Sequence, residues 1–114
     1  MEMASVRTNL VRGWILTAIA AGQSLFWSLP AAADTAANYK AKCAICHGAD
    51  GKADTPVGKK MGTHDFASPD VQKMSDDELT AVIADGKDKM PSYKKSLTPN
   101  QIKELVGYIR SLAK

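Results

Sequence analysis

The sequence has few aromatic residues, only two cysteines and no segment with the pattern of a β-strand. Its 114 residues contain two tryptophans, three tyrosines and two phenylalanines, and both tryptophans, Trp14 and Trp27, stand near the beginning. No segment alternates apolar and polar residues over the length of a strand, which excludes a sheet-based domain. The formal net charge is only +3, and no basic stripe is interleaved with aromatic residues, so no nucleic-acid partner is expected. A small domain with so little core material is expected to need a staple or a cofactor.

The beginning of the chain has the pattern of a secretory signal peptide. Arg7 and Arg12 give it a positive start, an apolar stretch covers residues 14–22, and Ala31-Ala32-Ala33 stands before Asp34. A positive start, an apolar middle and an A-x-A end are what the export machinery and its peptidase recognise. The two arginines are separated, so the general secretory route is favoured over the twin-arginine route.

We therefore expect residues 1–33 to be a cleavable signal peptide and residues 34–114 to form one small domain. Cleavage places this domain in the periplasm or an equivalent extracytoplasmic space. A retained membrane anchor is the alternative, because residues 14–33 are about as long as the roughly 20 residues that span a bilayer. The polar residues and Pro30 within that stretch weaken the alternative.

Two helices are marked by capping boxes. Ser75 followed by Glu78 predicts a helix that ends at Gly86. Thr98 followed by Gln101, with a proline between them, predicts a last helix. The apolar stripe of this last helix consists of Ile102, Leu105, Val106, Ile109 and Leu112.

A third helix and long connecting loops complete the expected fold, which is all-α. Residues 34–42 are rich in helix formers and run directly into the first cysteine. The segment from Gly48 to Met74 is interrupted by several glycines and prolines, which predicts a loop. A loop of that length is better explained if it wraps around something.

Both cysteines lie in one short window, Cys43-Ala44-Ile45-Cys46-His47. Residues three apart on a helical turn share a face, so Cys43 and Cys46 can reach the two vinyl groups along one edge of a porphyrin. His47 can then turn its imidazole toward the iron. The C-x-x-C-H pattern therefore predicts one covalently attached haem c with its iron bound by His47. A haem is also a large apolar body, which would supply the missing core.

Three other interpretations of these cysteines are weaker. A thioredoxin-type dithiol stands at the start of a helix after a strand, whereas this motif follows a helix-like segment. A zinc site needs four ligands, and the cysteines and histidines of the chain are only Cys43, Cys46, His47 and His64, two of them adjacent. A disulfide would close a very small loop and stabilise little.

Whether a second ligand fills the opposite side of the iron decides between electron transfer and the binding of gases or peroxide. Four side chains after residue 33 are candidate ligands: Met61, Met74, Met90 and His64. Met90 is favoured, because Pro91 restricts the backbone after it and helps to aim the sulfur. We therefore expect His47 and Met90 as the axial ligands, a pair that raises the reduction potential relative to two nitrogen ligands.

The other three candidates have simpler interpretations. Met74 directly precedes a capped helix and has the position of a hydrophobic staple. Met61 lies between glycines and is suited to fill a gap at the haem edge. His64 has the position of an exposed loop histidine.

With these residues established, the chain after residue 33 resembles the class I cytochromes c, especially the short bacterial mono-haem kind. The resemblance rests on Tyr39, residues 43–48, the capped helix from Ser75, Met90-Pro91 and residues 108–112. It implies a small cytochrome c fold, in which three main helices and long loops wrap around one covalently bound haem.

The resemblance also implies details of the haem surroundings. The first and last helices should cross close to Tyr39 and Tyr108. A loop carbonyl, that of Pro56, should accept the proton on Nδ1 of His47. Residues 63–70 match no feature of the family that we can identify, and Phe66 among them is a candidate to pack on the haem.

Together these features predict a soluble, exported one-electron carrier rather than an enzyme. Its expected partners are redox proteins met by transient docking, with membrane contact only through membrane-bound redox complexes, and no small-molecule substrate or nucleic acid. A monomer is expected. Candidates for a docking face, equally well explained as ordinary solvated lysines, are Lys59, Lys60, Lys87, Lys89, Lys94 and Lys95. Two alternatives stay open: an electron-entry subunit of a larger oxidoreductase, and a haem sensor or peroxide-reacting protein if Met90 is not a ligand.

Overall fold

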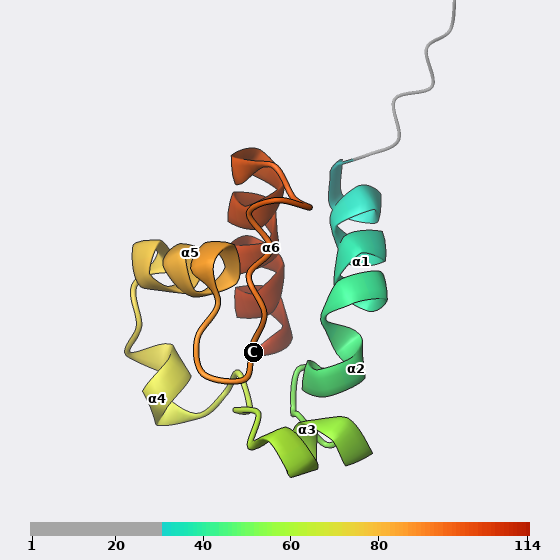
Figure 1. Cartoon of the computed structure of the whole chain (residues 1–114), viewed down its shortest axis with the longest axis vertical. Coiled ribbons are helices and arrows are strands. Elements are labelled where there is room, and N and C mark those ends of the chain that lie inside the picture. Colours follow the sequence, from blue (N-terminus) through green and yellow to red (C-terminus); the bar gives the residue numbers. More distant parts are fainter. Residues whose placement is uncertain (1–30) are drawn as a thin grey trace, which may run out of the picture.

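The computed structural model describes residues 31–114, and every regular element in that range is a helix (Figure 1). The elements are α1 (Ala31–Lys42), α2 (Ala44–His47), α3 (Pro56–Met61), α4 (Pro69–Gln72), α5 (Asp76–Asp85) and α6 (Pro99–Leu112). The predicted all-α class is confirmed. The predicted signal peptide, residues 1–33, lies outside the described residues except for its last three, which begin α1. None of the described helices is both long and apolar enough to cross a membrane.

The three main helices are α1, α5 and α6, as predicted from the sequence. Both predicted capping boxes are formed: Ser75 Oγ accepts from the Glu78 amide at 3.1 Å, and the Glu78 carboxylate accepts from the Ser75 amide at 2.7 Å. Thr98 and Gln101 exchange the same pair of hydrogen bonds at the start of α6. Each box satisfies two amides that the first turn of a helix leaves without partners.

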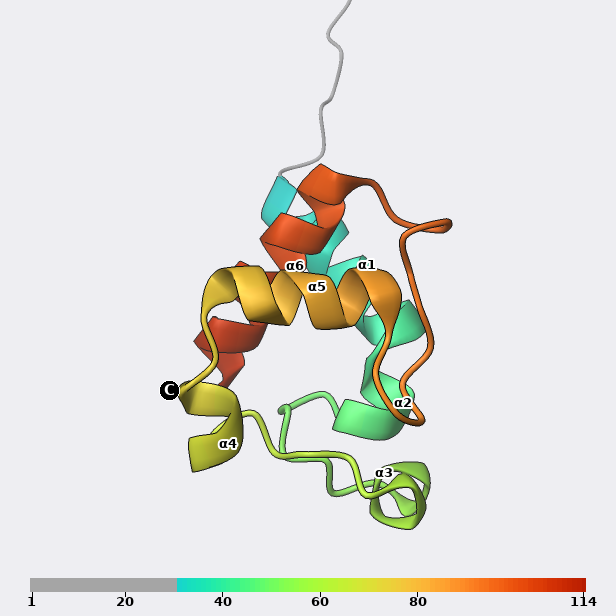
Figure 2. The same ribbon diagram turned by 60° about the vertical axis from the view of Figure 1, so that its left-hand side comes forward.

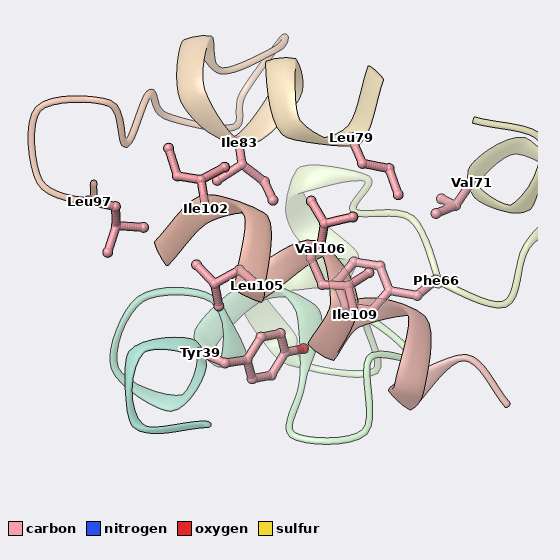
Figure 3. Packing of buried hydrophobic residues seen from close by; sticks show 10 residues of the cluster. All are labelled: Tyr39, Phe66, Val71, Leu79, Ile83, Leu97, Ile102, Leu105, Val106 and Ile109. Carbon is pink, nitrogen blue, oxygen red and sulfur yellow. The ribbon is translucent and has the colours of Figure 1, made fainter. Parts of the chain in front are cut away.

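Helix α6 lies between α1 and α5 and supplies most of the core (Figures 1 and 2). Four residues of its predicted apolar stripe are buried, with Leu105 only 1% exposed, and the fifth, Leu112, is half-buried. Figure 3 shows this stripe packed between Tyr39 of α1 and Ile83 of α5. The rings of Tyr39 and Tyr108 lie 5.0 Å apart, so the predicted closeness of these two tyrosines at the α1–α6 contact is confirmed.

The predicted loop between Gly48 and Met74 is wrong in part, because it contains α3 and α4. Both helices are very short, six and four residues, so neither can display an apolar periodicity. The signals that they do carry are local: Thr55 and Ser68 stand at the N-caps, each followed by proline. Such a pair is also common in turns, which is why it did not indicate a helix.

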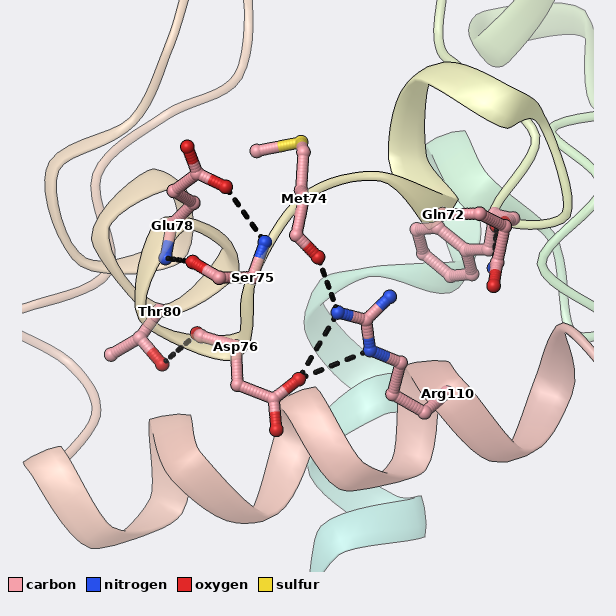
Figure 4. Close-up of polar contacts among 8 residues, drawn as sticks. Gln72, Met74, Ser75, Asp76, Glu78, Thr80 and Arg110 are labelled. Carbon is pink, nitrogen blue, oxygen red and sulfur yellow. Dashed lines mark hydrogen bonds and ion pairs between the residues drawn. The ribbon is translucent and has the colours of Figure 1, made fainter.

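Arg110 connects α6 to the start of α5 (Figure 4). Its guanidinium donates to Asp76 Oδ1 at 3.1 Å and to the carbonyl of Met74 at 2.6 Å. Met74 itself is half-buried and packs against the core cluster that contains Leu79, as a staple residue would. The guanidinium therefore fixes the chain where it enters α5.

Candidate functional site

The cysteine motif stands at a break between two helices. α1 ends at Lys42, Cys43 is the N-cap of α2, and the amides of Cys46 and His47 both bond to the carbonyl of Cys43, at 3.2 and 3.0 Å. The motif is thereby wound into one tight turn. Cys43, Cys46 and His47 all line the same cavity.

This cavity has a volume of about 530 Å³, which is within the range of sites that hold organic cofactors. Its walls come from α2, from the segments between α3 and α5, and from α5, α6 and the Met90 segment, and they are mainly apolar. The apolar side chains that line it are Phe66, Val71, Leu79, Val82, Ile83, Leu105 and Ile109, together with three methionines. Charged side chains line it as well, namely Asp70, Lys73, Glu78, Lys87, Asp88 and Lys89, and all six are exposed.

The imidazole of His47 is held against the core. It stacks on Phe66, with ring centroids 4.6 Å apart and planes at 23°. Burial lowers the pKa of His47, and the charge of the nearby His64 adds to this while the His64 backbone opposes it. The ring is therefore neutral at pH 7, which is the form that binds a metal.

The Cys43 thiol does not have the lowered pKa of a redox dithiol. Burial, the largest cause, raises the pKa of Cys43 to about 11, with Lys42 opposing and Cys46 adding to the shift. Catalytic dithiols need the opposite, a thiolate stabilised by a lowered pKa. The two cysteines are also not joined to each other. Within residues 31–114, no three side chains of the His, Cys, Asp and Glu types gather as a metal site, so a zinc site gains no support.

Met90 faces the same cavity from the segment after α5. It is half-buried against the core cluster and closes a tight turn, in which the amides of Lys87 and Met90 each bond to the other's carbonyl at 3.2 and 2.9 Å. Asp88 in this turn adopts a left-handed φ of 52°, which aspartate tolerates better than most residues. The predicted pair His47 and Met90 is therefore brought to one cavity.

The other three candidate ligands also line the cavity, which means that position alone does not select Met90. Met61 is 38% exposed and lies at the rim. Met74 is tied into the chain that enters α5, and its carbonyl is held by Arg110. His64 is exposed, as the sequence suggested.

Pro56 does not line the cavity; it is the exposed first residue of α3. Within the described part of the chain, Nδ1 of His47 is buried and has no hydrogen-bond partner, so the expected bond to the Pro56 carbonyl is not formed. The residues next to Pro56 do contact the motif. Thr55 Oγ1 donates to the carbonyls of Ile45 and Cys46, at 2.9 and 3.0 Å, and Gly58 approaches the Cys46 carbonyl so closely that a Cβ could not fit.

Thr55, Gly58 and Phe66 were therefore missed as residues that support the motif. The only sequence signal for the first two was the Thr-Pro pair at an N-cap, and Phe66 was considered only as a contact of the haem.

The residues present fit a covalently bound haem. Two thiols and an imidazole stand on one turn, a buried polar atom of that imidazole still has hydrogen-bonding capacity, and an apolar cavity adjoins them. Thioether ligands are available across the cavity.

Comparisons with known proteins find similarity to cytochromes. The family described as "Cytochrome C oxidase, cbb3-type, subunit III" matches residues 30–109. Among solved structures, the c-type cytochrome KustC0563 is 34% identical, with a TM-score of 0.65, and the match covers 70% of this chain and 98% of that one. A mutant of the same cytochrome, with phenylalanine in place of one tyrosine, is 33% identical, with a TM-score of 0.63 and coverages of 69% and 98%. No curated protein matches the chain.

Proposed function

The chain belongs to the cytochrome c family described as subunit III of the cbb3-type oxidase, and we propose that it is an exported one-electron carrier with one haem c. Cytochrome c domains transfer electrons and typically are not enzymes. The observation that carries the proposal is the turn of residues 43–47, whose cysteines and histidine face one apolar cavity with Met90.

Each residue of the site has a proposed role. Cys43 and Cys46 would hold the haem as thioethers, and His47 and Met90 would bind its iron. When bound, the haem supplies a reversible one-electron change at its iron. The neutral imidazole of His47 suits an axial position, and Phe66 keeps that ring in place. The apolar walls favour the less charged, reduced site, so they raise the reduction potential together with the methionine sulfur.

Partners are proposed to dock on the surface around α2 and α3. Three large apolar side chains are exposed there: Ile45 (66%), Val57 (39%) and Met61 (38%). The neighbouring Lys59 and Lys60 are exposed, and Lys59 is paired with Asp54 at 2.9 Å. A redox protein with an apolar centre and acidic rim fits this surface. Transient electron-transfer contacts of this kind bury less than about 1,200 Å² in total.

The location of the protein is part of the same proposal. Cytochromes of this family usually work outside the cytoplasm, and the leader pattern of residues 1–33 agrees with export to the periplasm or an equivalent space. We propose that the leader is removed and that the domain acts as a monomer, which touches membranes only through redox complexes embedded in them.

Mass spectrometry and redox spectra of the exported protein test the proposal. The mature chain should carry the mass of one haem, and its ferric spectrum should show methionine ligation. A mature chain without haem mass would exclude the proposed function.

Three methionine variants identify the sixth ligand. Replacing Met90 with alanine should leave the haem attached, remove the spectral signature of methionine and lower the reduction potential by on the order of 0.1 V. Met61→Ala and Met74→Ala are the matched controls, because both side chains line the same cavity. If one of these controls loses the signature while Met90→Ala keeps it, the ligand assignment is wrong.

A second candidate is an electron-entry subunit of a larger oxidoreductase. The observation that favours it is the description of the matching family, which is that of an oxidase subunit. Native purification separates the two possibilities: a free carrier elutes alone, whereas a subunit elutes with its complex.

A further inference from the structure

One long-range hydrogen bond connects the segment that carries Met90 to the motif that carries the cysteines. The hydroxyl of Tyr93 donates to the carbonyl of Lys42 at 2.9 Å, between residues 51 positions apart. Lys42 directly precedes Cys43. In Figure 2, the orange segment after α5 descends beside α2.

The acceptor is available because of the break between α1 and α2. In an unbroken helix, the amide of Cys46 would bond to the carbonyl of Lys42. Here that amide bonds to the carbonyl of Cys43 instead, at 3.2 Å. The Lys42 carbonyl is left without its helical partner, and Tyr93 satisfies it.

The segment that carries the donor, Tyr93, is held in place by hydrogen bonds to the end of α5. The amides of Tyr93 and Lys94 bond to the carbonyls of Ile83 and Ala84, both at 3.1 Å, and Ser92 Oγ donates to the Ala84 carbonyl at 2.5 Å. These bonds use carbonyls that the last turn of a helix leaves free. Residues 92–94 are therefore anchored on α5, and only the Tyr93 side chain reaches across to the cysteine motif.

The hydroxyl remains a donor at neutral pH. Burial raises the pKa of Tyr93, and the nearby Cys43 and Cys46 raise it further.

We propose that Tyr93 is a positioning residue, whose hydrogen bond to Lys42 holds the Met90 segment closed against the haem-attachment turn. The inference rests on the proposed ligation by Met90. A hydrogen bond of this kind contributes a small net free energy, so its loss should make opening of the segment about 3 to 10 times more favourable.

Imidazole is the probe, because it binds the ferric haem only when the sixth position opens. The holoprotein is titrated with imidazole and followed by its visible spectrum, in the wild type and in Tyr93→Phe, Tyr108→Phe and Met90→Ala. Tyr108 is the matched control: it is also a half-buried tyrosine, but within residues 31–114 its hydroxyl makes no hydrogen bond. Thermal unfolding of each variant separates local opening from general loss of stability.

The expected result is a dissociation constant for imidazole about 3 to 10 times lower in Tyr93→Phe than in the wild type, with Tyr108→Phe unchanged and Met90→Ala binding most tightly. An unchanged constant in Tyr93→Phe, with tight binding by Met90→Ala, overturns the role of Tyr93 and leaves the proposed function intact. An equal decrease of the dissociation constant in Tyr93→Phe and Tyr108→Phe also overturns it, because the effect would then reflect a general loss of stability. If Met90→Ala binds imidazole no better than the wild type, Met90 is not the ligand and both proposals fail.

Discussion

Gly86 shows how much one residue contributes to the placement of Met90. Its φ is +78°, and a Cβ built there would lie 2.6 Å from the carbonyl oxygen of Met90 and 2.9 Å from the amide of Ser92. No side chain fits in that space, and L-residues seldom adopt that φ. The glycine therefore lets the chain turn back closely on the end of α5.

Replacing Gly86 with alanine should destabilise the holoprotein by about 1–3 kcal/mol and weaken the methionine signature of the ferric spectrum. Denaturant unfolding and the visible spectrum measure the two effects. Gly107→Ala is the control, because it lies in α6 with open space around its Cα, and it should stabilise the protein by about 0.5–1 kcal/mol. Equal effects of the two substitutions would contradict the close approach described for Gly86.

The residues of the candidate site were predictable from sequence to different degrees. Cys43, Cys46 and His47 carry a chemical pattern that few other sites share, and Met90 was favoured by the proline that follows it. Thr55 was not recognised and Phe66 was expected only as a haem contact, because a hydrogen bond to a distant carbonyl and a ring stacked on His47 leave no pattern in the chain. The Tyr93 bond could not be foreseen for the same reason, since it depends on a helix break 51 residues earlier.

At the scale of elements, α5 depends on its capping box. The Ser75 amide is the largest cause that lowers the pKa of Glu78, followed by the Ser75 side chain. A lowered pKa means that the folded state favours the carboxylate. The stabilisation is therefore present above the ordinary pKa of about 4.5 and is lost as the pH falls through the lowered value.

Glu78→Gln should reduce the drop in melting temperature that the wild type shows between pH 7 and pH 3. Circular dichroism of the holoprotein at both pH values measures this drop. Asp77→Asn is the control. The Asp77 carboxylate lies in the same first turn but makes no hydrogen bond in the described part of the chain, so its removal should change the drop in melting temperature less. The interpretation fails if both variants change the drop equally.

The elements were predicted well where a physical signal extends over several turns. α5 and α6 each have a capping box and an apolar stripe, and α5 also has a glycine at its end. α3 and α4 fill one or two turns each, and short helices depend on tertiary contacts rather than on their own sequence. α1 begins at Ala31, inside the alanine run that was assigned to the leader.

At the scale of the whole molecule, the cavity replaces the centre of the core. Its walls include Leu105 and Ile109 of α6 and Ile83 of α5, which also belong to the core cluster. At about 530 Å³, it is several times larger than a core cavity of about 150 Å³ that can stay empty in a stable protein. The fold is therefore expected to depend on what fills this space.

A chain with both Cys43 and Cys46 replaced by alanine, which cannot hold a haem covalently, should lose its sharp thermal transition while keeping part of its helical signal. Far-ultraviolet circular dichroism and thermal melts, with the wild-type holoprotein alongside, measure this difference. A sharp transition at the wild-type temperature would show that the described helices pack without the cofactor.

The packing of α1 against α6 also sets an order of events for the cell. A chain is made from its N-terminus, so residues 43–47 exist while α6, which supplies the Leu105 and Ile109 wall, is still unmade. Until α6 is made, the cavity beside the attachment turn lacks the wall that Leu105 and Ile109 supply. The topology thus provides a time window in which the turn exists before the cavity is complete, and a chain shortened before α6 would be left permanently without that wall.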